Sequence, residues 1–135
     1  MRILSGQVRG GYGAASDNLR HVVKLIQART GLGPLVDGTF NLGLSEPYMI
    51  RPDAQIEMSE YNLIELIKLQ RCRVGGMQAL IMRPNTHGQG SAQGLAQIEI
   101  MSTALLRSHL GVKDGDMVAV EVEGDEFWWM GLSDA

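Results

Sequence analysis

Two neutral oxygen donors stand close together in the stretch Asp37-Gly38-Thr39-Phe40-Asn41. Thr39 and Asn41 are two positions apart, and residues with this spacing share one face of a strand. Their hydroxyl and amide oxygens could complete the octahedral shell of a magnesium ion whose main ligands are the phosphates of a nucleotide. The alternative is that both side chains satisfy backbone groups of a turn.

A second candidate is the glycine-rich stretch Gly10-Gly11-Tyr12-Gly13, which leads into a helix that Ser16 could cap. Glycines let a backbone approach a phosphate closely, and a helix N-terminus offers unpaired N–H groups to an anion. The stretch lacks the Lys-Ser/Thr pair of a Walker loop and is not a dinucleotide fingerprint. An ordinary turn between a strand and a helix remains the alternative.

Glu99 lies between Ile98 and Ile100 on an expected strand, where its carboxylate could reach a substrate hydroxyl; a solvated strand face is the alternative. The pair Thr86-His87 opens a second glycine-rich stretch, 88–94, and could face a ligand or serve a turn. No spacing of His, Cys, Asp or Glu predicts a zinc site, and no Ser-His-acid arrangement for nucleophilic catalysis can be read.

The elements that must position these residues are mostly short strands joined by glycine turns. One helix is expected from Ser16, with apolar residues at helical spacing up to Ile26 and an end at Gly31. A second short helix is expected after a Ser102 or Thr103 cap, with an end at Gly111. Strands are expected at 3–9, 40–44, about 55–58, 96–100 and 118–122. Within 63–82, the apolar spacing at 63–70 would suit a helix, but Gly75-Gly76 and the apolar run 77–82 suit a hairpin, which we favour. The segment 127–130 is expected as a last strand covering the core or as a partner-facing patch.

This pattern predicts a fold that is mostly β with two helices, because a doubly wound α/β sheet would need more helices between its strands. We expect a small closed or partly closed β-barrel. With 135 residues, the chain fits one domain spanning 1–135.

The composition narrows the function classes. Hydrophobic residues make up 44% and charged residues 20% of the chain, which is typical of a globular domain. We expect no membrane span and no signal sequence, and Cys72 as the single cysteine fits a reducing compartment, so a cytoplasmic location is expected. The net charge of -3 argues against broad nucleic-acid binding and favours small-molecule partners.

Several of these motifs together resemble the archaeal CTP-dependent riboflavin kinases, and this resemblance implies a small six-stranded β-barrel of the cradle-loop type. The family's Gly-Thr-Leu-Asn-Leu motif is similar to Gly38-Thr39-Phe40-Asn41-Leu42, after a similar Leu32-Gly33-Pro34. Its apolar strand with a Pro and a Thr-x-His ending resembles residues 79–87. The family's later motifs are similar to Ile98-Glu99-Ile100, Leu106-Arg107, Leu110-Gly111-Val112 and Asp114-Gly115-Asp116 with Val118.

The resemblance implies a kinase that moves the terminal phosphate of CTP to the ribityl 5'-hydroxyl of riboflavin and forms FMN. It implies Thr39 and Asn41 as ligands of Mg²⁺, and Glu99 as the residue that orients or deprotonates the hydroxyl. Thr86 and Glu99 would contact the flavin. The nucleotide, CTP or another, would bind residues of two segments: Gly11, Tyr12, Gly13, Ala14 and Ala15, and Leu105, Leu106, Arg107 and Ser108.

The chain departs from the family in the first of these segments. The family loop usually runs Gly-x-Gly-x-Gly and then a basic residue, whereas here Gly13 is followed by Ala14, Ala15 and Ser16 and then by Asp17. One alternative is therefore a non-catalytic domain on the same barrel that binds a flavin or a nucleotide. A DNA-binding regulator of the swapped-hairpin type is the third hypothesis, and the apolar segment 127–130 could pair two subunits as a homodimer.

Overall fold

The computed structural model describes residues 1–10, 22–36, 38–61, 66–84, 92–125 and 128–130 of the chain. Strands dominate these residues. They are β1 (Arg2–Arg9), β2 (Phe40–Leu44), β3 (Ala54–Ile56), β4 (Ile67–Val74), β5 (Met77–Pro84), β6 (Gln97–Ser102) and β7 (Met117–Val122).

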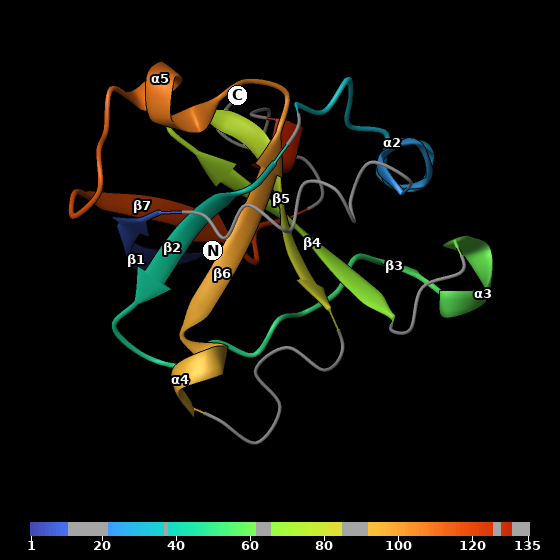
Figure 1. Cartoon of the computed structure of the whole chain (residues 1–135), viewed down its shortest axis with the longest axis horizontal. Helices are drawn as coiled ribbons and strands as arrows, with labels where there is room; N and C mark the ends of the chain where they lie inside the picture. Colours follow the sequence, from blue (N-terminus) through green and yellow to red (C-terminus); the bar gives the residue numbers. More distant parts are fainter. Residues whose placement is uncertain (11–21, 37, 62–65, 85–91, 126–127, 131–135) are drawn as a thin grey trace.

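The strands form one antiparallel sheet in the order β3-β4-β5-β6-β2-β1-β7, and a further pairing of β4 with β7 closes it on itself. Six strands thus make a barrel, and β3 adds to β4 on the outside, beside α3 (Figure 1). The ladder that closes the barrel is short, with Arg73 opposite Glu121 and Val74 opposite Val120. The predicted six-stranded barrel is confirmed.

The predicted hairpin is also confirmed. Its two strands, β4 and β5, pair in register over their full length and are joined by Gly75 and Gly76. Both glycines have a positive φ, 57° and 79°. A two-residue hairpin turn with the twist of the flanking strands requires this conformation, which glycine adopts without a steric penalty.

Helices are short and lie outside the barrel. The two predicted helices correspond to α2 (Val23–Thr30) and α5 (Leu106–Leu110), and each ends at a left-handed glycine, Gly31 or Gly111. Two single-turn helices, α3 (Met58–Tyr61) and α4 (Ala92–Leu95), were not expected, so the predicted strand near 55–58 ends at Ile56. Among the described residues, no helix is long and apolar enough to cross a membrane.

The predicted cap of α5 is wrong. The residue before the helix is Leu105, and no side chain caps it. Ser102 instead donates from Oγ to the carbonyl oxygen of Ala104, 2.6 Å away. A serine hydroxyl readily bonds its local backbone in this way, and here it stabilises the turn before the helix. The Ser16 cap predicted for the first helix lies outside the described residues.

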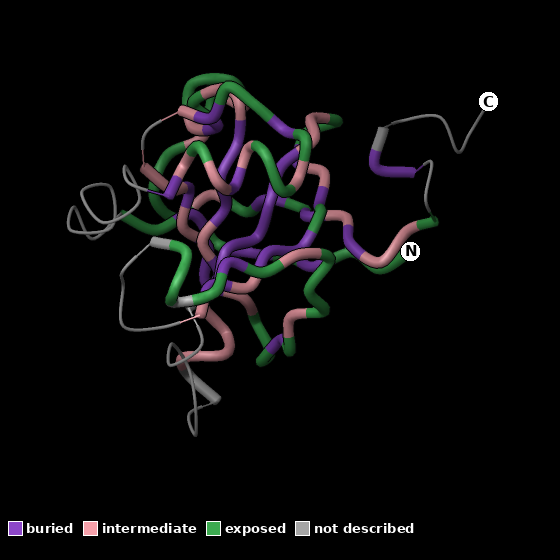
Figure 2. The backbone as a smooth tube through the Cα atoms, turned by 90° about the vertical axis from the view of Figure 1, so that its right-hand side faces the viewer, coloured by how far each residue is buried: buried purple, intermediate pink, exposed green. Residues whose placement is uncertain are grey.

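One apolar cluster fills the barrel and runs through the centre of the molecule (Figure 2). Alternate residues of all six barrel strands point into it, as the period of a strand requires. Leu106 of α5 and Tyr48, which follows β2, join the same cluster. The strand members are Leu4, Val8, Phe40, Leu42, Cys72, Val74, Ala79, Ile81, Ile98, Ile100, Val118, Val120 and Val122.

A second apolar cluster covers the outer face of β4 and β5. Leu69, Leu80 and Met82 point away from the lumen and are buried by α2, by Leu32 and Leu35 after it, and by the last described turn. That turn is η1 (Trp128–Met130), a 3-10 helix. Trp128 and Trp129 are only 6% and 7% exposed.

The C-terminal segment is therefore not the predicted last strand, although it does cover the core. The backbone N–H of Trp128 donates to Asp125 Oδ1 at 2.8 Å, which starts the turn. Because both tryptophans are buried, they are not available as a partner-facing patch. The homodimer stays a prediction.

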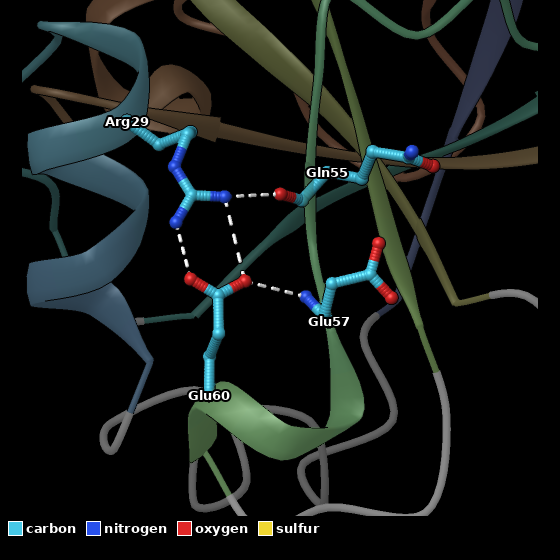
Figure 3. A network of polar contacts seen from close by, with 4 residues as sticks. All are labelled: Arg29, Gln55, Glu57 and Glu60. Carbon is cyan, nitrogen blue, oxygen red and sulfur yellow. Dashed lines mark hydrogen bonds and ion pairs between the residues drawn. The ribbon is translucent and has the colours of Figure 1, made fainter.

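An ion pair ties α2 to the edge of the sheet (Figure 3). The Arg29 guanidinium binds the Glu60 carboxylate and donates to the Gln55 carbonyl oxygen at 2.5 Å. Glu60 also accepts the backbone N–H of Glu57 at 2.7 Å. Arg29 holds the pKa of Glu60 below its ordinary value, chiefly through the hydrogen bond that it donates.

Candidate active site

The alternation of β2 decides which of its side chains can do chemistry. Phe40 and Leu42 are buried in the lumen, so Asn41 between them faces outward. The register pairs Asn41 with Glu99 of β6 on one side and with Arg9 of β1 on the other. Directly paired residues of antiparallel strands point to the same face, so these three polar residues form one row across the outside of the barrel.

Thr39 completes this group from the residue before β2. Its Oγ1 lies 3.2 Å from Asn41 Oδ1 and 3.4 Å from Glu99 Oε1, and it donates a hydrogen bond toward these oxygens. The strand begins just after Gly38, whose φ of 85° turns the chain into it. Three oxygen-bearing side chains that are up to 60 residues apart in the sequence thus meet at one point.

A pocket of about 130 Å³ opens at this point. Thr39, just before β2, and Asn41 of β2 line it on one side, and the segment before and within α5 lines it on the other side with Leu105, Leu106 and Arg107. The pocket therefore joins the predicted metal residues to three of the four predicted nucleotide residues of that segment. Ser108, the fourth, is exposed on α5 and does not line the pocket.

Arg107 is held in a fixed position at the rim. Its Nη2 donates to the backbone oxygen of Arg9 at 3.0 Å and forms an ion pair with Asp114. These contacts connect α5, the end of β1 and the turn before β7. The guanidinium thus has a carboxylate partner before any ligand arrives.

A second, smaller hollow adjoins the same row on the other side of Asn41. It is lined by Arg9, Gly10, Asn41 and Glu99, with β6 residues 97 and 98. Arg9 and Asn41 line both hollows, so they stand between the two. Sequence reasoning missed Arg9, because only the pairing of β1 with β2 brings it beside Asn41.

The remaining predicted site residues fall outside the described part of the chain. These are Thr86 and the loop residues Gly11, Tyr12, Gly13, Ala14 and Ala15. Their predicted contacts with a flavin and a nucleotide stay predictions. Within the described residues, no group of three His, Cys, Asp or Glu could hold a metal ion by itself.

Comparison with known proteins identifies the family of this chain. The family model for the CTP-dependent riboflavin kinase domain (CTP-dep_RFKase, described as domain of unknown function DUF120) matches residues 8–122. The chain belongs to this family. The match includes the whole row of Arg9, Asn41 and Glu99 and most of the barrel.

A curated relative of this chain is the riboflavin kinase of Pyrobaculum arsenaticum (strain DSM 13514 / JCM 11321 / PZ6). It is 31% identical to this chain over 134 residues. The alignment covers 90% of this chain but 58% of the relative, so the chain spans little more than half of that protein's length. The family resemblance found in the sequence is thereby confirmed.

Proposed function

We propose that this chain is a CTP-dependent riboflavin kinase, which transfers the terminal phosphate of CTP to the ribityl 5'-hydroxyl of riboflavin and releases CDP and FMN. The observation that carries the proposal is the meeting of Thr39, Asn41 and Glu99. Thr39 and Asn41 line the larger pocket, and Asn41 and Glu99 line the smaller hollow beside it. Membership of the family supports this activity over the binding-domain and DNA-binding alternatives.

The donor set fits a magnesium ion that arrives with a nucleotide. Thr39 and Asn41 offer two neutral oxygens, and hard oxygen ligands are those that Mg²⁺ prefers. Neutral donors hold this ion weakly unless phosphates supply negative ligands, and no described acidic cluster replaces them. When bound, the ion would neutralise charge on the phosphates during transfer.

The protein's own residues then have separate tasks. Leu105 and Arg107 bind the nucleotide on the α5 side of the pocket, and Thr39 and Asn41 fix the position of its terminal phosphates. The ribityl oxygen forms a bond to the terminal phosphorus while the bond from that phosphorus to its bridging oxygen breaks, and Glu99 accepts the hydroxyl proton. Positioning of this kind supplies most of the catalysis in phosphoryl transfer.

The test is FMN formation from riboflavin with Mg²⁺ and either CTP or ATP, comparing the wild type with Asn41→Ala. We expect product with CTP, and a loss of about a hundredfold or more in the variant, because a metal ligand in the transition state is worth several kcal/mol. Gln7→Ala, on the neighbouring strand and exposed, is the matched control. Folded wild-type protein that binds riboflavin or CTP but makes no product would support the binding-domain alternative instead.

A further inference from the structure

The Arg9 guanidinium lies at the candidate active site. Among the described residues it makes no hydrogen bond and no ion pair, although Arg107 close by is paired with Asp114. Arg9 lines both hollows of the site and stands opposite Asn41 in the β1–β2 ladder. An arginine fork that is directed along a site and is not bound to a carboxylate is suited to bind a phosphate.

Gly43 makes room for this guanidinium. A Cβ atom built on Gly43 would lie 2.7 Å from Cζ and 2.8 Å from Nη2 of Arg9, distances that real atoms do not tolerate. The Arg9 side chain therefore crosses the glycine, which lies two residues along β2 from Asn41 and on the side away from Thr39. This is the side of the smaller hollow, which Glu99 also lines.

The two sides of Asn41 thus differ in chemistry. On the Thr39 side lie the residues proposed for the nucleotide. The smaller hollow on the Gly43 side is lined by Arg9 and by Glu99, the proposed acceptor of the hydroxyl proton, which also accepts the hydrogen bond from Thr39. The family's basic residue after the glycine loop is replaced here by Asp17, so the loop does not contribute that positive charge. Arg9 brings a cation to the site from a different strand.

We infer that Arg9 binds the transferred phosphate on the acceptor side, both while it moves to the ribityl oxygen and afterwards in FMN. The inference rests on the proposed kinase function and adds a phosphate-binding residue to it. Because riboflavin lacks the phosphate, Arg9 distinguishes product from substrate. Its removal should weaken the binding of FMN and leave the binding of riboflavin unchanged.

The experiment is a titration of the protein with FMN and with riboflavin, followed by flavin fluorescence, at fixed salt. For Arg9→Ala we expect FMN affinity to fall about tenfold to a hundredfold, as for the loss of a charge-assisted hydrogen bond, and riboflavin affinity to change less than about twofold. The FMN affinity of Arg9→Lys should lie between those of the wild type and Arg9→Ala, since lysine keeps the charge but lacks the planar fork. In both variants, the kcat of FMN formation should also be lower than in the wild type, and lower in the variant that binds FMN more weakly.

Gly43→Ala offers an independent variant that leaves the charge of the protein unchanged. Its new Cβ displaces the guanidinium, so FMN affinity should fall as in Arg9→Ala. Arg2→Ala is the control, because it removes the same charge from the other end of the same strand, about 23 Å away at 3.3 Å per residue. It should leave both flavin affinities unchanged.

The outcomes separate this inference from the proposed function. If the wild type binds FMN and Arg9→Ala binds it equally well, the role of Arg9 is wrong and the kinase proposal stands. If Arg9→Ala weakens the binding of riboflavin as much as the binding of FMN, Arg9 contacts the flavin and not the phosphate, and the inference is again wrong. If the wild type binds neither flavin, both proposals fail together.

Discussion

The outer surface of the barrel has two faces of opposite character. On β4 and β5 the outward residues Leu69, Leu80 and Met82 are apolar and are buried with α2 and the two tryptophans. On β1, β2 and β6 the outward row of Arg9, Asn41 and Glu99 is polar and borders two hollows. Burial of apolar surface is the main source of stability, whereas substrates need open polar groups. The covered face therefore contributes stability, and the open face is where we expect the chemistry.

Glu99→Gln should give the largest effect and should act on chemistry alone. The substitution keeps the shape of the side chain but removes the carboxylate that we propose accepts the hydroxyl proton. General base catalysis typically contributes about 10² to 10⁴ in rate, so kcat should fall by at least about a hundredfold. Steady-state FMN formation measures this, and the melting temperature should stay close to that of the wild type. A variant with full kcat would show that Glu99 is not the base.

Leu69→Ala tests the covered face. Leu69 is fully buried in the outer cluster, and its truncation leaves a cavity, so the free energy of unfolding should drop by about 2–5 kcal/mol. Urea denaturation measures the drop. Below the unfolding transition, kcat should remain near the wild-type value, because Leu69 lies on β4 and lines neither hollow. A selective loss of kcat in folded protein would contradict the division between the two faces.

Trp129→Phe makes a smaller change on the same covered face. The indole Nε1 donates to the carbonyl oxygens of Cys72 and Ala79, at 3.1 Å and 3.3 Å, and Arg71 lies over the ring at 4.9 Å. Phenylalanine keeps the aromatic ring but removes the donor, so we expect a loss of about 1–3 kcal/mol in unfolding free energy. Denaturation of Trp128→Phe, whose indole donates to Glu121 and not to β-hairpin carbonyls, provides a comparison.

Glu60→Gln should give the smallest effect, visible mainly as a change with pH. Arg29 lowers the pKa of the Glu60 carboxyl in the folded chain. The pair therefore stabilises the fold at pH values above 4.5, the ordinary pKa of a glutamate. That contribution is lost as the pH falls through the lowered pKa. On acidification, the melting temperature of the wild type should therefore fall more than that of Glu60→Gln. Equal profiles would mean that the ion pair contributes nothing to stability.

Much of the barrel could be predicted because its signals are local. The alternation of Phe40 and Leu42 around Asn41, and the glycine pair between β4 and β5, decide their elements within a few residues. The end of the chain could not be predicted in this way. Its apolar residues favour a strand, but the side chain of Asp125 caps a 3-10 turn and directs both tryptophans onto the barrel.

The site shows the same limit. Thr39 and Asn41 could be paired from their spacing, and Glu99 from its motif, but their meeting depends on the β2–β6 register, which joins distant segments. Arg9 carried no local signal at all. An arginine at the end of an exposed strand is usually solvated, and only the β1–β2 register and the absent side chain of Gly43 bring it to the site.

The shortest ladder of the barrel bears on how the molecule opens. β4 and β7 share two residue pairs, whereas β1 and β7 share six and β4 and β5 share eight. Local fluctuations should separate the short seam first, and amide hydrogen exchange would be fastest there among the ladders. Around the barrel, the β2–β6 pairing lies diametrically opposite, with three strands between it and the seam on either side. The barrel can therefore breathe along its seam while Asn41 and Glu99 keep their register.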